Sequence, residues 1–219
     1  MYAITIEEIT RIAKEIPITK SGGDGRIDSA IKEPEFLKEI KRILLDKNPT
    51  WDVLIPSSRN SFDIMINSIQ INLKLSDCKS SDNSASKKAI YYSLTGRLDY
   101  PSSSNFNEFY KRVKEAYHDK TIKTHRCKQT EYHYLVKNKI TGDVLLKPIF
   151  DIHTYVSNAS NDMQINWGKE FINADYYTED VDYLKKIRSL ITCLQCSRVA
   201  SINTSNKFAY ADIDSFMPE

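Results

Sequence analysis

The segment SFDIMINSIQINLKLSDCKSSDNSASKKAIYYSLT, residues 61–95, indicates how the rest of the chain is organised. It is typical of a strand, a tight turn, a second strand, a polar loop and a helix. We expect strands at residues 62–66 and 69–75, because apolar and polar residues alternate along the second of them. Its two faces carry Ile71, Leu73 and Leu75 on the apolar side and Gln70, Asn72 and Lys74 on the polar side. The segment therefore predicts a β-hairpin that buries one face.

The polar face of this hairpin carries a charge in the middle of a strand. Lys74 is flanked by apolar residues on the same strand, and Asp63 is expected on the neighbouring strand. A cation held at the edge of a core requires an acidic partner or a bound anion. A phosphodiester together with a metal ion would meet this requirement.

The hairpin resembles the active-site core of the PD-(D/E)XK nucleases, and most closely the type II restriction endonucleases. That family places an Asp on one strand and (D/E)-x-K on the next. Asp63 and Lys74 match the first acid and the lysine, whereas Asn72 stands where the family has its second acid. The polar loop and the run KKAIYYSLTG that follow Lys74 also resemble restriction enzymes of this group. The resemblance implies an α/β fold with a restriction-endonuclease-like central mixed sheet flanked by helices.

The resemblance further implies a Mg²⁺-dependent endodeoxyribonuclease. Such an enzyme recognises a short sequence in double-stranded DNA and hydrolyses it to leave 5′-phosphates. The implied metal ligands are Asp63, Asn72 and the backbone carbonyl of Leu73. Lys74 would contact the attacking water and a phosphate oxygen, and its charge would stabilise the transition state.

One acidic residue is missing from this set, since the amide of Asn72 can coordinate a metal ion but adds no charge. In the family, a helix before the Asp strand can lend an acid. We expect such a helix at residues 35–45, starting at Pro34, with Glu35 and Glu39 on one face. Glu39 is the preferred compensating residue for catalysis and metal binding, although a merely solvated acidic pair is the simpler interpretation.

DNA contacts are expected from polar and basic side chains in loops and at helix starts. The candidates are Lys20, Arg26, Arg59, Asn60, Ser76, Asp77, Lys87, Lys88, Asn158 and Asn161. Gln164 and Asn166 extend the last polar cluster. Each group also has a simpler interpretation: a connector at residues 20–28, an exposed basic pair at 87–88 and a surface turn at 158–166.

Length and composition are those of one globular domain. The chain has 219 residues, 41% of them hydrophobic, and a net charge of +2. We expect a single nuclease domain over 1–219, with a catalytic core at about 27–117 and a part at 118–219 for DNA recognition and dimerisation. A palindromic site would match a homodimer. The sequence has no signal peptide and no apolar run of membrane-spanning length, so we expect a cytoplasmic protein without membrane contact.

Other chemistries are less well supported by the sequence. Cys193 and Cys196 have the spacing of a metal-binding pair, but they lie within an amphipathic helical pattern and have no second pair. Two alternatives to a restriction enzyme stay open. One is a structure-specific nuclease similar to a junction resolvase, and the other is an inactive DNA-binding module on the same fold, with Asn72 as the trace of lost catalysis.

Overall fold

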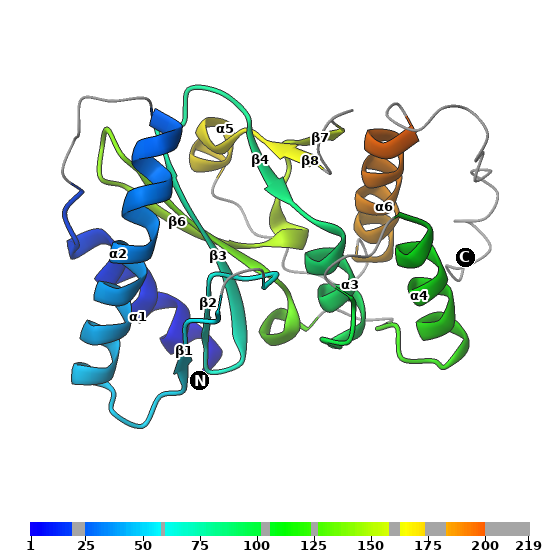
Figure 1. Cartoon of the computed structure of the whole chain (residues 1–219), viewed down its shortest axis with the longest axis horizontal. Helices are drawn as coiled ribbons and strands as arrows, with labels where there is room; N and C mark the ends of the chain where they lie inside the picture. Colours follow the sequence, from blue (N-terminus) through cyan, green and yellow to red (C-terminus); the bar gives the residue numbers. More distant parts are fainter. Residues whose placement is uncertain are drawn as a thin grey trace.

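A mixed five-stranded sheet lies at the centre of the protein (Figure 1). The computed structural model describes residues 1–18, 25–57, 60–101, 106–123, 127–157, 163–173 and 183–199. The strand order is β1-β2-β3-β5-β6, with β3 and β5 parallel and the other neighbours antiparallel. These strands span Val53–Leu54, Ile64–Ile66, Ile69–Ser76, His133–Asn138 and Val144–Pro148, respectively. The prediction of a central mixed sheet is confirmed.

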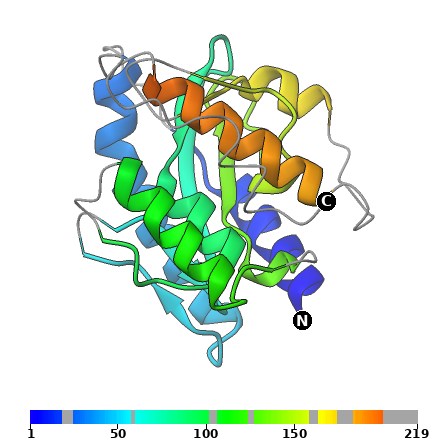
Figure 2. The ribbon, with the colours of Figure 1, turned by 90° about the vertical axis from the view of Figure 1, so that its right-hand side faces the viewer.

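Helices cover both faces of this sheet. The helices α1 (Tyr2–Glu15) and α2 (Gly25–Lys47) pack on one face, and α3 (Lys87–Thr95), α4 (Phe106–His118) and α6 (Tyr183–Val199) share the core on the other. Figure 2 shows the green α4 and the orange α6 in front of the strands, with the dark blue α1 behind them. The α/β layering is therefore as predicted.

A second, smaller sheet continues the structure at one end of the central sheet. It has three antiparallel strands in the order β4-β8-β7, which span Asp82–Ala85, Met163–Ile165 and Tyr155–Ser157, respectively. Helix α5 (Trp167–Ile172) follows β8, and two short 3₁₀ turns, η1 (Lys128–Thr130) and η2 (Ile149–Asp151), flank the β5–β6 hairpin.

The predicted hairpin is formed by β2 and β3. Ile64 pairs with Ile71 and Ile66 with Ile69, so the chain reverses at Asn67 and Ser68. Both turn residues have positive φ, of 48° and 70°, as a two-residue type I′ hairpin turn requires. Strand β2 is shorter than expected, because Phe62 and Asp63 precede it.

The sheet has one hydrophobic cluster on each face, and the alternation along β3 decides which of its side chains enter which cluster. Ile69, Ile71, Leu73 and Leu75 are buried with residues of α1 and α2 in one hydrophobic cluster. The opposite face of the sheet, which holds Tyr134 and Val136 of β5, contributes to the cluster beneath α3, α4 and α6. Period-two patterning thus places Asn72 and Lys74 on the side of the second cluster.

One sequence expectation, the start of the second helix, needs correction. Helix α2 begins at Gly25 rather than at Pro34, and Pro34 lies inside the helix. The central sheet crosses the boundary expected near residue 117, since β5 and β6 come from residues 133–148, β5 pairs directly with β3, and β6 pairs with β5. Residues on both sides of that boundary therefore form one sheet.

The end of α1 is held by a lysine from the sheet. Lys137 of β5 is 2% exposed, and its Nζ donates hydrogen bonds to the carbonyl oxygens of Ala13, Lys14 and Ile16 at 2.8, 3.2 and 2.5 Å. Carbonyls in the last turn of a helix have no partner within the helix, and a cation there also favours the helix dipole. Lys137 therefore joins α1 to the central sheet.

Replacing Lys137 by Met should lower the free energy of unfolding by about 2–3 kcal/mol, because the buried carbonyls at the end of α1 lose their donor. Urea unfolding followed by circular dichroism measures this change. The matched control is Lys38→Met on the exposed side of α2, which should change stability by less than about 0.5 kcal/mol. Equal effects of the two variants would contradict a specific role of Lys137.

Candidate active site

Two carboxylates line the part of the β3 edge that β2 leaves uncovered, next to the residue at which β2 begins. The last ladder contact is the hydrogen bond from the Asp63 N–H to the Ile71 carbonyl, at 3.0 Å. Beyond it, Asp63 Oδ2 accepts the Leu73 N–H at 2.8 Å, and Glu33 Oε1 of α2 accepts the Leu75 N–H at 3.2 Å. The two acids therefore take the place of a neighbouring strand along this edge.

The backbone carbonyl of Leu73 belongs to the same edge. In a β-strand the N–H and C=O of one residue point to the same side. The Leu73 N–H points to Asp63, while the Ser76 carbonyl on the opposite edge accepts the N–H of Lys139. The Leu73 carbonyl is thus on the side of both carboxylates, as the resemblance implies for a metal ligand.

Asn72 and Lys74 lie on the sheet face next to this edge. The pairing of Ile64 with Ile71 brings Asp63 opposite Asn72. The Oδ1 atom of Asn72 is buried and has no hydrogen-bond partner among the described residues. A buried amide oxygen that has no hydrogen-bond partner and lies beside a carboxylate can bind a cation or accept a hydrogen bond from a water molecule.

A buried tyrosine, Tyr132, forms hydrogen bonds to the segment before Asp63 and to helix α3. Tyr132 is 2% exposed, and its hydroxyl donates to the carbonyl of Ser61, two residues before Asp63. Its N–H donates to Ser93 Oγ of α3 at 2.7 Å. Burial, together with the nearby Tyr134 and Asp63, raises the pKa of Tyr132 well above its ordinary value, so it stays a neutral donor.

The electrostatics of the site favour a cation. Burial raises the pKa of Asp63, against the opposing effects of the Leu73 N–H and the Lys74 charge. Burial also raises the pKa of Glu33, and the charge of Asp63 adds to that effect while Lys74, the Leu75 N–H and Lys139 oppose it. A further positive charge would favour the ionised forms of both acids.

The donor set fits Mg²⁺. Within the described ranges, no group of three or more His, Cys, Asp or Glu side chains is placed to hold a metal ion. Mg²⁺, however, is usually bound through one or two carboxylates together with waters and substrate phosphates. Asp63, Glu33, the Leu73 carbonyl and Asn72 Oδ1 offer only hard oxygen atoms, which this ion prefers.

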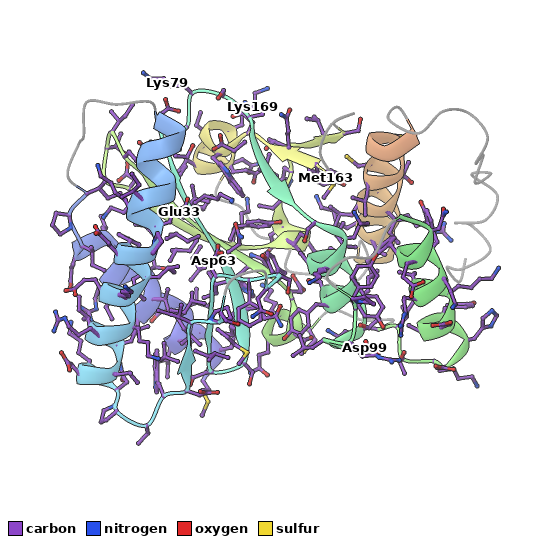
Figure 3. All side chains as sticks on the ribbon, viewed as in Figure 1. Glu33, Asp63, Lys79, Asp99, Met163 and Lys169 are labelled. Carbon is purple, nitrogen blue, oxygen red and sulfur yellow. The ribbon has the colours of Figure 1, made fainter. Side chains whose placement is uncertain are left out.

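Glu39, the preferred compensating acid, is not at the site. It forms hydrogen bonds of 2.9 and 2.7 Å with Arg42, and its side chain is 41% exposed. Glu39 lies about 9 Å along the helix axis from Glu33, and Glu35 is also exposed. Figure 3 shows Glu33 on the part of α2 near β3, with Asp63 close by. Glu33 takes the position that was expected of Glu39.

Several proposed DNA contacts have structural roles instead. Ser76 is 6% exposed and donates to Asp82 Oδ2 at 2.6 Å, and Lys87 is 8% exposed. Asn166 caps α5 by accepting the Lys169 N–H at 3.0 Å. Ser76 and Asn166 thus form hydrogen bonds within the fold, and Lys87 is buried.

The other proposed contacts fall into two groups. Asn60 and Asp77 are exposed, Gln164 lies in the small sheet, and Lys88 is partly exposed on α3. Lys20, Arg59, Asn158 and Asn161 lie outside the described residues, as does the side chain of Arg26, whose backbone is in α2. Asn60 and Lys88 both line a pocket beside the segment that leads into β2.

Cys193 lies in a helix, as the amphipathic pattern predicts, and one histidine is buried in the core. Cys193 is half-buried in α6, packs against the core, and has a pKa raised by burial to about 11. His133 is buried, with Nε2 2.6 Å from the Tyr2 hydroxyl and Nδ1 2.9 Å from the Glu131 carbonyl. Both residues therefore serve the packing of the fold.

Comparison with known proteins gives no family assignment: no family model matches the sequence, and no curated protein matches it significantly. Among the described helices, none is long and apolar enough to cross a membrane.

Proposed function

We propose that the protein is a Mg²⁺-dependent endodeoxyribonuclease of the type II restriction class. The observation that carries this proposal is the edge of β3, where Asp63 and Glu33 accept the N–H groups of Leu73 and Leu75 beside Lys74. The mixed sheet with helices on both faces is compatible with a restriction-endonuclease-like fold. The two partly buried acids, the intervening backbone carbonyl and the lysine match the chemistry that the resemblance implies.

Each residue has a distinct part in the proposed reaction. Asp63, Glu33 and the Leu73 carbonyl would hold Mg²⁺, with Asn72 Oδ1 binding it or orienting a water. When bound, Mg²⁺ supplies charge stabilisation at the scissile phosphate and lowers the pKa of a coordinated water. Lys74 would hold a non-bridging phosphate oxygen and the attacking water, and its positive charge would favour the transition state.

The substrate proposed is double-stranded DNA with a short recognition sequence, cut to leave 5′-phosphates. A homodimer is proposed because a two-fold protein matches a palindromic site. The chain has a net charge of only +2, so DNA binding would depend on local clusters rather than on overall charge.

Digestion of a sequenced plasmid with and without Mg²⁺, followed by mapping of the ends, tests this function. Cleavage at discrete sites that requires Mg²⁺ and leaves 5′-phosphates is the expected result. Cleavage confined to branched DNA would instead identify a junction-resolving nuclease. DNA binding without any cleavage would identify an inactive binding module.

Glu33→Gln should reduce cleavage at limiting Mg²⁺ concentration by at least about tenfold, since metal-binding sites lose affinity on this scale when one supporting group changes. The glutamine oxygen can still accept the Leu75 N–H, so the fold should persist. Glu39→Gln on the same helix is the matched control and should cut at the wild-type rate. Titration of the initial rate with Mg²⁺ for both variants measures the difference. The reverse order of effects would restore Glu39 as the compensating acid.

A further inference from the structure

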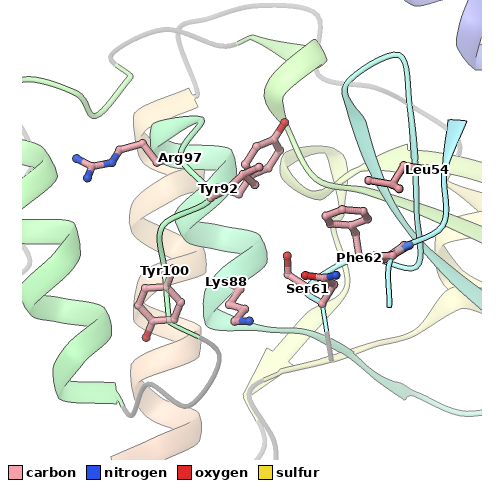
Figure 4. Close-up of a pocket in the computed structure, with 10 residues that line it drawn as sticks. Leu54, Ser61, Phe62, Lys88, Tyr92, Arg97 and Tyr100 are labelled. Carbon is pink, nitrogen blue, oxygen red and sulfur yellow. The ribbon is translucent and has the colours of Figure 1, made fainter. Parts of the chain in front are cut away.

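A pocket of about 240 Å³ lies directly beside the segment that carries Asp63 (Figure 4). Its wall on one side is formed by Asn60, Ser61 and Phe62, the three residues that precede Asp63. The other side is formed by α3 and the chain that follows it. Consecutive Cα atoms are about 3.8 Å apart, so whatever occupies the pocket is a near neighbour of the proposed scissile phosphate.

Aromatic and aliphatic side chains make up much of the lining. Phe62, Tyr92 and Tyr100 line the pocket and are 8%, 7% and 6% exposed. Leu54 and Leu98 lie at the rim and are 43% and 64% exposed. Exposed leucines next to aromatic rings are typical of a surface that binds a flat apolar group.

The pocket also holds a positive charge without a counter-charge. Arg97 is neutralised by Asp99, which accepts hydrogen bonds from its guanidinium group. Lys88, by contrast, makes no hydrogen bond or ion pair among the described residues, and it extends from α3 into the space beside Ser61 (Figure 4). Burial lowers the pKa of Lys88 with no carboxylate to oppose it. An anion in the pocket would supply the missing charge.

A ligand that satisfies both features has a flat apolar part and an anionic part. A nucleotide combines these, since bases stack on aromatic side chains and phosphates bind lysine. The pocket volume of about 240 Å³ lies just below the range of about 300–1,000 Å³ for small-molecule sites, so it can hold at most one such unit and no duplex segment.

We propose that this pocket binds one nucleotide of the cleaved strand, unstacked from its neighbours, with its base against the aromatic side chains and its phosphate beside Lys88. This inference rests on the proposed nuclease function and adds a substrate-binding site to it. The energetic cost of unstacking one nucleotide is a few kcal/mol, which the aromatic contacts and the lysine would offset.

Calorimetric titration of the metal-free protein with 2′-deoxyadenosine 5′-monophosphate tests the pocket without DNA cleavage. Wild type should bind this nucleotide. Lys88→Met should bind it at least about tenfold more weakly, the scale of one charge-assisted contact. The control Lys111→Met changes an exposed lysine of α4 and should leave binding unchanged.

A second variant and two further ligands complete the test. Leu98→Asp changes an exposed rim residue without disturbing the core, and its negative charge should also weaken nucleotide binding. Deoxyadenosine should bind more weakly than the nucleotide, and inorganic phosphate should not compete at equal concentration. Equal competition by phosphate would identify a simple anion site and overturn the proposal, as would unchanged binding by both variants or no binding by wild type.

The outcomes for the pocket and for the nuclease are distinguishable. Plasmid cleavage without nucleotide binding would overturn the pocket and leave the nuclease function in place. Nucleotide binding that depends on Lys88, without plasmid cleavage under any Mg²⁺ concentration, would keep the ligand class of the pocket but overturn its place beside a cleaved strand.

Discussion

Lys74→Ala is expected to slow Mg²⁺-dependent DNA cleavage by at least about 10²-fold, the scale of losing one positioned catalytic group. Lys74 shares β3 with Leu73 and Leu75, whose N–H groups bind Asp63 and Glu33, and its charge acts on both carboxylates. Without it, the phosphate would lose its positive contact on the strand beside the proposed metal ligands. Single-turnover cleavage of a duplex containing the mapped site measures the rate.

Asp63→Asn should have an effect at least as large. The asparagine Oδ1 can accept the Leu73 N–H as the aspartate does, so the edge of β3 should stay intact while the site loses a negative charge. DNA binding, measured by electrophoretic mobility without divalent cations, should stay within a few-fold of wild type for both variants. Lys111→Ala on α4 is the control for the loss of a lysine. Wild-type cleavage by Lys74→Ala would exclude β3 as the catalytic strand.

The hairpin at the centre of the site follows from local sequence. Alternation along residues 69–75 fixes which side chains enter the core under α1 and α2, and a slip of one residue would expose Ile71 and Leu73 to the wrong face. The register that brings Asp63 opposite Asn72 is a direct consequence. This part of the site could be predicted because strand, turn and strand are neighbours in the chain.

Glu33 could not be identified in the same way, because Pro34 follows it. Proline is favoured in the first turn of a helix, which placed Glu33 outside the expected helix. In the structure α2 begins at Gly25, and Glu33 falls on the same stripe as Leu37, Ile40 and Leu44. Spacings of four, three and four residues share one helix face. A helix extended through the proline would have directed Glu33, rather than Glu39, toward the sheet.

The burial of the residues predicted to contact DNA could not be predicted from the sequence, for a physical reason. Residue type and position in a loop or at a helix start do not determine burial, which depends on what packs above. Lys87 is buried, the Ser76 hydroxyl donates a hydrogen bond to Asp82, and Asn166 caps helix α5. Asn and Ser are common at turns and helix starts because their side chains bond to nearby backbone groups. The same residue types are therefore expected both at helix caps and at base contacts, and the sequence does not separate the two.

A fully buried ion pair joins strand β6 to helix α5. Lys147 of β6 and Glu170 of α5 are both 0% exposed, with Nζ and Oε2 2.9 Å apart. The other oxygen, Oε1, accepts the N–H groups of His153 and Thr154 at 2.8 and 2.7 Å, and Lys147 also donates to the Asn173 carbonyl at 2.8 Å. These contacts join β6, α5 and the chain before β7.

Glu170→Gln should therefore lower the free energy of unfolding by about 3–5 kcal/mol, because it removes the carboxylate that is paired with the buried Lys147. Glu115→Gln, which breaks the exposed pair with Lys111 on α4, is the control and should cost less than about 1 kcal/mol. Urea unfolding at neutral pH measures both. A loss below about 1 kcal/mol for Glu170→Gln would mean that water reaches Lys147.

The effect of Glu170→Gln should depend on pH. Burial by itself raises the pKa of Glu170, but the hydrogen bonds from Lys147, Thr154 and His153 outweigh it and hold the pKa below its ordinary value. A depressed carboxyl pKa contributes stability above the unfolded value of about 4.3, and this contribution is lost as pH falls through the folded value. The difference between wild type and Glu170→Gln should therefore shrink below about pH 4.

The double variant Lys147→Met, Glu170→Gln separates the charge from the hydrogen bonds. Methionine fills the space of the lysine chain without a charge, and the glutamine oxygen can still accept the donors of His153 and Thr154. Replacing a whole buried pair is often far less costly than removing one partner. The double variant should therefore be more stable than Glu170→Gln alone, a coupling that a thermodynamic cycle measures. Additive losses would place the main contribution of Glu170 in its contacts with Thr154 and His153 rather than in its pairing with Lys147.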